Sequence, residues 1–155
     1  MNWGFWKGEM KIDLRKRTFQ PGETIEGTVR IDLKKPTRAR ALIVRFKGEE
    51  IVRTNQRGRD GRDDNRTETY VICDVKERIG GAKEYLKDEV PFRIRIPQDV
   101  VRRGRGSAMG NAVGGVLGAL TGKTERSEFR WYIKAGLDIP KGIDVSKTEK
   151  INVYE

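Results

Sequence analysis

The sequence predicts an all-β protein that folds as a β-sandwich. In most segments that contain apolar residues, apolar and polar positions alternate with a period of two, which is typical of strands with one buried face. Polar stretches that contain proline or glycine separate these segments, and only one segment has its apolar residues at helical spacing. Because no helices cross between the strands, two packed antiparallel sheets are the simplest architecture.

Three strands are expected in the first third of the chain. The first precedes a turn at residues 18–23, where a proline presets φ and a glycine tolerates positive φ. The second ends at the Lys-Lys-Pro stretch of residues 34–36, and the third begins at Arg40 and is interrupted at Gly48. The inward-facing residues of these strands are expected to be Met10, Ile12, Leu14, Ile25, Gly27, Val29, Ile31, Leu33, Leu42, Val44 and Phe46.

Residues 53–68 contain no apolar side chain and two glycines, so we expect a charged flexible loop here. The next strand has a nearly continuous apolar run from Tyr70 to Val75. This run indicates either burial on both faces or an edge strand that lies across the core. Cys73 lies inside the run with no histidine to activate it, which predicts a buried core thiol.

The remaining strands lie in the second half of the chain. Residues 83–90 form a short helical turn or a strand, and clean alternation follows from Val90 to Ile96. Prolines at positions 91 and 97 favour an edge position for that strand. A long strand is expected from Phe129 to Ile139, and the last strand contains the inward-facing pair Ile151 and Val153.

The length of 155 residues fits one domain, residues 1–155. The composition, 35% hydrophobic and 36% charged, predicts a small core within a heavily charged surface, as in proteins from hot environments. No apolar run reaches membrane-spanning length, and the N-terminus has no basic start followed by an apolar stretch. We therefore expect a cytoplasmic protein.

The net charge of +10 is concentrated in two regions. Residues 34–59 carry nine basic and two acidic residues, and residues 101–130 carry six basic and two acidic residues. This asymmetry predicts an acidic partner, whereas the alternative interpretation is solubility with surface ion pairs. The candidate basic binding face consists of residues on the solvent phase of their strands: Arg45, Lys47, Arg93, Arg95 and Lys134.

Residues 101–127 form a basic, glycine-rich insertion that is predicted to be either a short helix or disordered. Glycines four residues apart would allow another helix to approach closely. The segment could therefore mediate self-association or lie on an anionic membrane, and the alternative is a disordered loop or a flap over the sandwich's own core. Its apolar stripe consists of Met109, Val113, Val116, Leu117 and Leu120.

Catalysis is not expected. The sequence has no histidine, which removes the commonest general base and the commonest metal ligand, and its single cysteine lies in an apolar run. We assign no catalytic residue, no cofactor and no metal site.

Several stretches resemble the N-terminal domain of the arrestin family, especially α-arrestins and the bacterial sporulation-control relatives. The stretches are FQPGETIEGTVRIDLKKPTRARALIVRFKGEE (19–50), VPFRIRIPQDV (90–100), FRWYIKAGLDIP (129–140) and LRKRTF (14–19). They occur in the family's order over residues 10–154. The resemblance implies an immunoglobulin-like sandwich that is not an enzyme and binds other proteins. Arrestins place two such sandwiches in tandem, whereas we expect one in these 155 residues, with a longer insertion after residue 100.

Two classes of function follow. The first is a protein-interaction or scaffold module, with an unknown protein partner or a second copy of the chain as a homodimer. The second is a protein that binds an anionic surface, either lipid or nucleic acid, through the basic face and the glycine-rich segment. Nucleic acid is the less favoured of these, because Tyr132 is the only strand aromatic on the outward phase and stacking platforms are therefore scarce.

Overall fold

The structure is a computed structural model that describes residues 8–57, 61, 63–100, 123–142 and 144–154. This part of the chain contains eight strands and no helix, which confirms the all-β prediction. The strands are β1 (Gly8–Leu14), β2 (Thr18–Phe19), β3 (Thr24–Ala39), β4 (Ala41–Arg57), β5 (Asp63–Gly80), β6 (Lys83–Arg95), β7 (Lys123–Asp138) and β8 (Val145–Val153).

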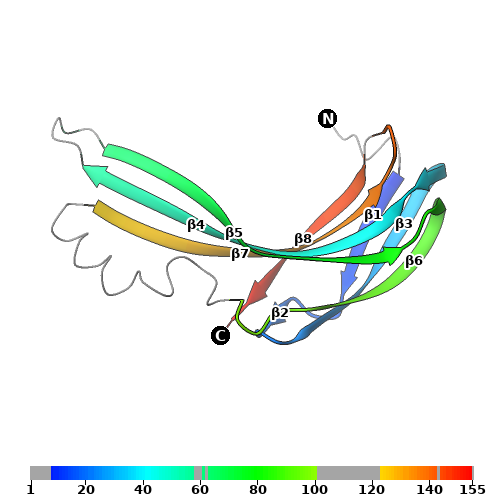
Figure 1. The fold of residues 1–155 in the computed structure, drawn as a ribbon, viewed down its shortest axis with the longest axis horizontal. Coiled ribbons are helices and arrows are strands. Elements are labelled where there is room, and N and C mark those ends of the chain that lie inside the picture. The colour runs from blue at the N-terminus through cyan, green and yellow to red at the C-terminus, as the bar shows by residue number, and fades with distance from the viewer. Residues whose placement is uncertain (1–7, 58–60, 62, 101–122, 143, 155) are drawn as a thin grey trace.

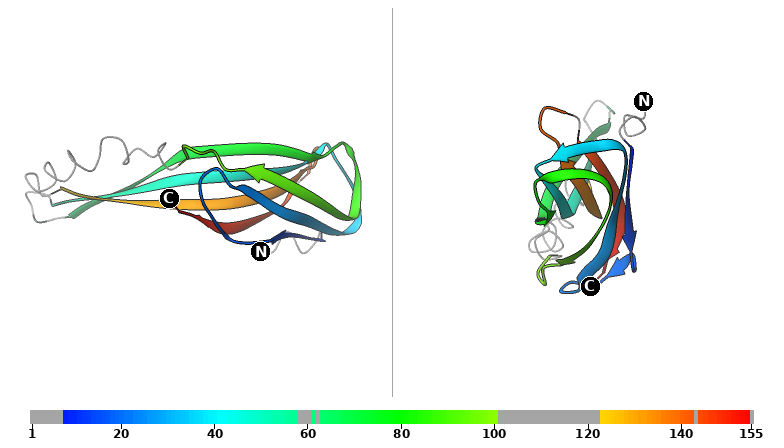
Figure 2. Two further views of the ribbon diagram at one scale, coloured as in Figure 1. Left: turned by 90° about the horizontal axis from the view of Figure 1, so that it is seen from below. Right: turned by 90° about the vertical axis from the view of Figure 1, so that its right-hand side faces the viewer.

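Two sheets pack face to face and enclose one core (Figures 1 and 2). The smaller sheet has the order β1-β3-β6, and the larger sheet has the order β2-β8-β7-β4-β5. Neighbouring strands are antiparallel except for β2, which pairs parallel to β8. The prolines around β6 predicted an edge strand, and β6 is indeed at an edge of the smaller sheet.

The alternating residues face inward as predicted. Ile25 and Val29 of β3 and Val44 and Phe46 of β4 are fully buried, while the polar residues between them are at least partly exposed. Among the inward positions predicted for the first three strands, only Leu14 and Gly27 are half-buried. Period-two geometry places successive side chains on opposite faces, so the buried face of each strand follows from its local sequence.

An aromatic stack occupies the core where β4 and β7 run side by side. The Trp131 ring stacks on Phe46 at a centroid distance of 5.9 Å and on Phe129 at 6.0 Å. Gly48 is the Cα partner of Trp131 in the adjacent strand. A Cβ atom at position 48 would lie 2.3 Å from the indole ring, so the missing side chain makes room for the tryptophan.

Three strands of the larger sheet continue well beyond the sandwich (Figure 1). We call this extension the blade and define it as residues 51–57 of β4, 63–69 of β5 and 123–128 of β7, none of which belongs to the core cluster. Strand β8 pairs with β7 only from Trp131 to Leu137, so none of the described strands pairs with the other side of β7 in the blade. The blade is therefore a three-stranded ribbon with β4 at its centre.

The prediction of a charged loop at residues 53–68 was wrong for most of that range. Residues 53–57 and 63–68 are strand residues that pair with each other, and β4 also pairs with β7 as far as Gln56. The backbone ladder satisfies N–H and C=O groups whatever the side chains are, so a strand between two partners does not require an apolar face.

Two further strand boundaries differ from the predictions. Strand β3 does not end at residues 34–36 but continues to Ala39, with a register irregularity between Asp32 and Thr37 that accommodates the proline. Strand β7 begins at Lys123, within the predicted insertion of residues 101–127, rather than at Phe129. Residues 101–122 of that insertion lie outside the described residues.

Candidate functional site

Three of the five predicted basic residues lie on the outer face of the larger sheet. Arg45 and Lys134 are Cα partners on β4 and β7, and Lys47 is the next outward residue of β4. Arg45 Nε lies 3.1 Å from Asp74 Oδ1, and Lys47 Nζ lies 3.6 Å from Glu49 Oε1. Much of the positive charge on this face is therefore already paired within the protein.

Tyr132 completes this polar network. Its hydroxyl donates a hydrogen bond of 2.6 Å to Glu49 Oε1, the oxygen that also faces Lys47. Burial and this hydrogen bond to a carboxylate raise the pKa of Tyr132 to about 12. Tyr132 is thus a neutral donor at physiological pH, and its ring lies within a charged network rather than forming a free stacking surface.

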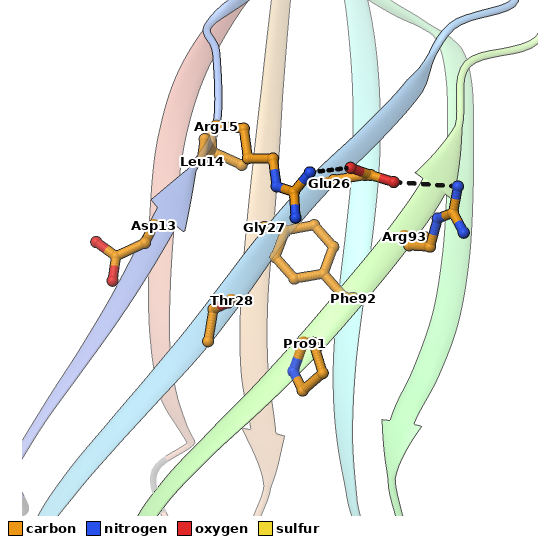
Figure 3. A pocket seen from close by; sticks show the side chains of 9 residues that line it. All are labelled: Asp13, Leu14, Arg15, Glu26, Gly27, Thr28, Pro91, Phe92 and Arg93. Atoms are coloured by element: carbon orange, nitrogen blue, oxygen red, sulfur yellow. Dashed lines mark ion pairs between the residues drawn. The ribbon is translucent and has the colours of Figure 1, made fainter.

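The other two predicted residues, Arg93 and Arg95, lie on β6 at the outer face of the smaller sheet. Figure 3 shows that the Glu26 carboxylate lies between Arg93 and Arg15. Arg93 Nη2 is 3.0 Å from Glu26 Oε1, and Arg15 Nη1 is 3.0 Å from Glu26 Oε2. The Glu26 carboxylate on β3 therefore holds one guanidinium group from β6 and one from the residue that follows β1.

A hollow of about 460 Å³ lies beside this ion-pair cluster (Figure 3). Its lining includes Leu14, Pro91 and Phe92, and the Phe92 ring lies over Gly27. A Cβ atom at position 27 would lie 2.6 Å from the Asp13 carbonyl oxygen and 2.8 Å from the Phe92 ring. The hollow thus combines apolar surface with charges that are already paired, which gives it no strong preference for a charged ligand.

The five predicted basic residues do not form a single face. All five are at least partly exposed, as the alternation predicted, but they are divided between the outer faces of two sheets that pack against each other. Alternation indicates whether a side chain points into the core or out of it, but it does not indicate which sheet the strand joins. Binding of an acidic partner by these residues stays a prediction.

Strand β5 forms an edge of the larger sheet and presents apolar surface there. Among the described strands it pairs only with β4 in this sheet. A register shift pairs Gly48 with Cys73 and Glu49 with Val71, which leaves Ile72 between them as a β-bulge. Cys73 consequently points into the core and is 3% exposed, whereas Val71 is 56% exposed. The edge-strand interpretation of the Tyr70–Val75 run and the buried core thiol are both confirmed.

The blade brings together residues that the sequence analysis did not consider as a group. Arg53 of β4 is the Cα partner of Thr67 on one side and of Arg126 on the other. A loop at residues 53–68 would not bring Arg53 next to Thr67 and Arg126, so the loop prediction gave no indication of this arrangement. The β-branched residues Thr67 and Thr69, two positions apart before Tyr70, are the signal that could have indicated an earlier start for β5.

One predicted feature falls outside the part of the chain that the structure describes. The candidate self-association residues Met109, Val113, Val116, Leu117 and Leu120 lie outside the described residues. Across residues 8–57, 61, 63–100, 123–142 and 144–154, no three histidine, cysteine, aspartate or glutamate side chains are placed to hold a metal ion. Within the same ranges, no helix is long and apolar enough to cross a membrane.

These features define a β-sandwich of two sheets that offers sheet faces, shallow hollows and open strand edges for binding. Comparison with known families identifies the family of this chain. The arrestin (or S-antigen) N-terminal domain matches residues 8–155, and the chain belongs to this family. Arrestin-like families are generally non-enzymatic, and membership of this family suggests a scaffold or adaptor role. The predicted family resemblance and the predicted fold class are both confirmed.

A similar solved structure is that of Spo0M, a sporulation control protein from Bacillus subtilis. The two chains are 21% identical with a TM-score of 0.57, and the match covers 96% of this chain and 50% of Spo0M. At this identity the likeness concerns the fold, and this chain spans half the length of its neighbour. A search of curated proteins finds no match.

Proposed function

We propose that this protein is a non-enzymatic adaptor that binds an extended segment of a partner protein along the edge of β5. The observation that carries this proposal is the open edge itself. Strand β5 runs from Asp63 to Gly80, and only one side of it is paired with another described strand of the sheet. An unpaired edge offers a row of backbone N–H and C=O groups to an incoming strand.

The side chains on this edge favour a particular kind of segment. Val71 is the most exposed large apolar residue of the edge, at 56%, and it faces outward. Lys76 shares the outward phase as the Cα partner of Arg45, and the Asp74 carboxylate on the same face is already ion-paired with Arg45. A partner strand with an apolar residue beside Val71 and an acidic residue beside Lys76 would complement both features.

The proposal can be tested with extended peptides selected from a random displayed library on the full chain. We expect the selected peptides to protect backbone amides of β5 from hydrogen exchange when they bind. Val71→Lys should weaken their binding by about tenfold, because it replaces an apolar contact with a charge that guards the edge. Leu86→Lys, at an exposed apolar residue of the smaller sheet, is the matched control and should bind as wild type.

Two results would contradict the edge proposal. One is protection that maps away from β5, for example to the outer face of the smaller sheet. The other is equal loss of binding in Val71→Lys and Leu86→Lys. A homodimer formed through the same edge is a related expectation, and light scattering of wild type and Val71→Lys at high protein concentration would detect it.

A further inference from the structure

A second hollow, of about 420 Å³, lies on the blade and has an unusual lining. It is formed by three arginines, two threonines and two asparagines, and no acidic residue lines it. Arginine, threonine and asparagine side chains can all donate hydrogen bonds. The lining consists of Arg53, Thr54, Asn55, Asn65, Arg66, Thr67 and Arg126.

The strand register places two of these arginines directly opposite each other. Arg53 of β4 and Arg126 of β7 are Cα partners, and like charges at such positions repel. Arg53 Nη1 lies 3.5 Å from Glu128 Oε2, but Glu128 also faces Arg130, whose Nε lies 3.8 Å from Glu128 Oε1. Arg126 forms no ion pair with any residue that the structure describes. The Glu128 carboxylate is therefore shared by Arg53 and Arg130, and the positive charge of Arg126 adds to theirs.

Polar donors complete the same row of the blade. Thr67 is the Cα partner of Arg53 on β5, and the pair Asn55 and Asn65 lies two residues further along the same strands. These positions share the face of Arg53 and Arg126, because residues two apart in a strand point the same way. An anion at this point would meet guanidinium, hydroxyl and amide groups from all three strands of the blade.

We propose that this hollow binds a phosphate group, with Arg53 and Arg126 as its principal ligands. Guanidinium groups are planar and donate two parallel hydrogen bonds to phosphate oxygens, which makes arginine well suited to this role. A bound phosphate would also remove the repulsion between the two arginines. The site is separate from the β5 edge residues Val71 and Lys76, so this proposal goes beyond the adaptor function and does not depend on it.

The test uses inorganic pyrophosphate as the probe, titrated calorimetrically into the full chain at low ionic strength. Arg126→Gln should weaken binding by about tenfold or more, because a charge-assisted hydrogen bond is lost. Arg126→Lys keeps the charge but not the planar fork and should bind with intermediate affinity. The matched control is Arg38→Gln, which removes one exposed arginine from β3 of the smaller sheet and should change the affinity by less than about twofold.

Thermal unfolding provides a second readout of binding and also shows whether each variant still folds. Arg126→Gln should melt at or above the wild-type temperature without ligand, because it relieves a like-charge pair. Pyrophosphate should raise the melting temperature of wild type and of Arg38→Gln but not that of Arg126→Gln. Equal weakening in Arg126→Gln and Arg38→Gln, or no wild-type binding at millimolar pyrophosphate, would overturn the proposal.

Vesicles distinguish the two sources of such a phosphate group. Phosphatidic acid in phosphatidylcholine vesicles presents a phosphate monoester, and phosphatidylcholine alone is the reference. Arg126-dependent sedimentation with phosphatidic acid identifies a lipid headgroup, whereas Arg126-dependent binding of pyrophosphate alone identifies a soluble phosphate compound. Val71→Lys should leave both measurements unchanged, so failure of the phosphate site and failure of the adaptor proposal are separate results.

Discussion

At the scale of single residues, the contact between Gly48 and Trp131 leaves no room for a side chain in the core. A methyl group at position 48 would lie 2.3 Å from one indole carbon and 2.5 Å from the next. The ring cannot move far, because Phe46 and Phe129 stack against it. We expect Gly48→Ala to lower the free energy of unfolding by about 1–3 kcal/mol, measured by urea denaturation.

A second glycine on the neighbouring strand serves as the control. A Cβ atom at Gly136 would lie 3.7 Å from the Ser146 side chain, which is an ordinary van der Waals contact. Gly136→Ala should therefore leave the free energy of unfolding unchanged or raise it by up to about 1 kcal/mol, since alanine is favoured over glycine within a strand. Equal losses in both variants would show that the Trp131 contact is not the cause.

At the scale of elements, the blade extends beyond the part of the larger sheet that packs on the smaller one. Arg53 and Thr67 are Cα partners on its two adjacent strands, so a two-residue Asn-Gly turn can join them in place of residues 54–66. We expect this shortened chain to lose no more than about 1 kcal/mol of unfolding free energy, because no core residue is removed. Urea denaturation followed by circular dichroism measures the change.

A core substitution gives the reference loss of unfolding free energy for that experiment. Leu42 is fully buried between the sheets, and Leu42→Ala should cost about 2–5 kcal/mol. A shortened blade that destabilises the protein as much as Leu42→Ala would show that the blade and the sandwich fold as one cooperative unit.

At the scale of the whole molecule, charge governs stability against pH. The sequence has no histidine, the only side chain with an ordinary pKa between 5 and 8, so stability should be flat from pH 6 to 8. A hydrogen bond from Lys16 lowers the pKa of Glu23. Desolvation opposes a lower pKa at Asp88, but hydrogen bonds from Lys83 and the Leu86 amide outweigh it. Groups with a lowered folded-state pKa stabilise the protein above the unfolded-state pKa and lose that contribution as pH falls through the folded value.

We therefore expect the free energy of unfolding to decrease as the pH drops below about 5. The net charge rises from +10 toward +33 as the 23 carboxylates become protonated, and self-repulsion adds to the loss. Urea denaturation at a series of pH values measures this profile. Added salt should restore part of the stability at low pH by screening the repulsion. A step in stability between pH 6 and 8 would contradict the prediction.

Local sequence determined which residues are buried and that the chain forms sheets. Val44 and Phe46, or Phe92 and Ile94, reveal their buried phase within a few residues, because the side chains of a strand alternate between its two faces. For the apolar run from Tyr70 to Val75, local sequence left two interpretations, burial on both faces or an edge strand that lies across the core. The order of the stretches at residues 19–50, 90–100 and 129–140 was enough to indicate the family.

Only the tertiary structure decided which strands are neighbours and how far they extend. Arg45 and Arg93 have the same outward phase in sequence, yet strand pairing places them on opposite outer faces of the sandwich. Arg53 and Arg126 are far apart in the chain and become direct partners in the blade. Strand pairing depends on backbone hydrogen bonds between distant segments, and apart from the β-branched Thr67 these leave no pattern in the polar side chains of residues 53–68. The candidate phosphate site is for that reason a property of the register of the sheet rather than of any single stretch of sequence.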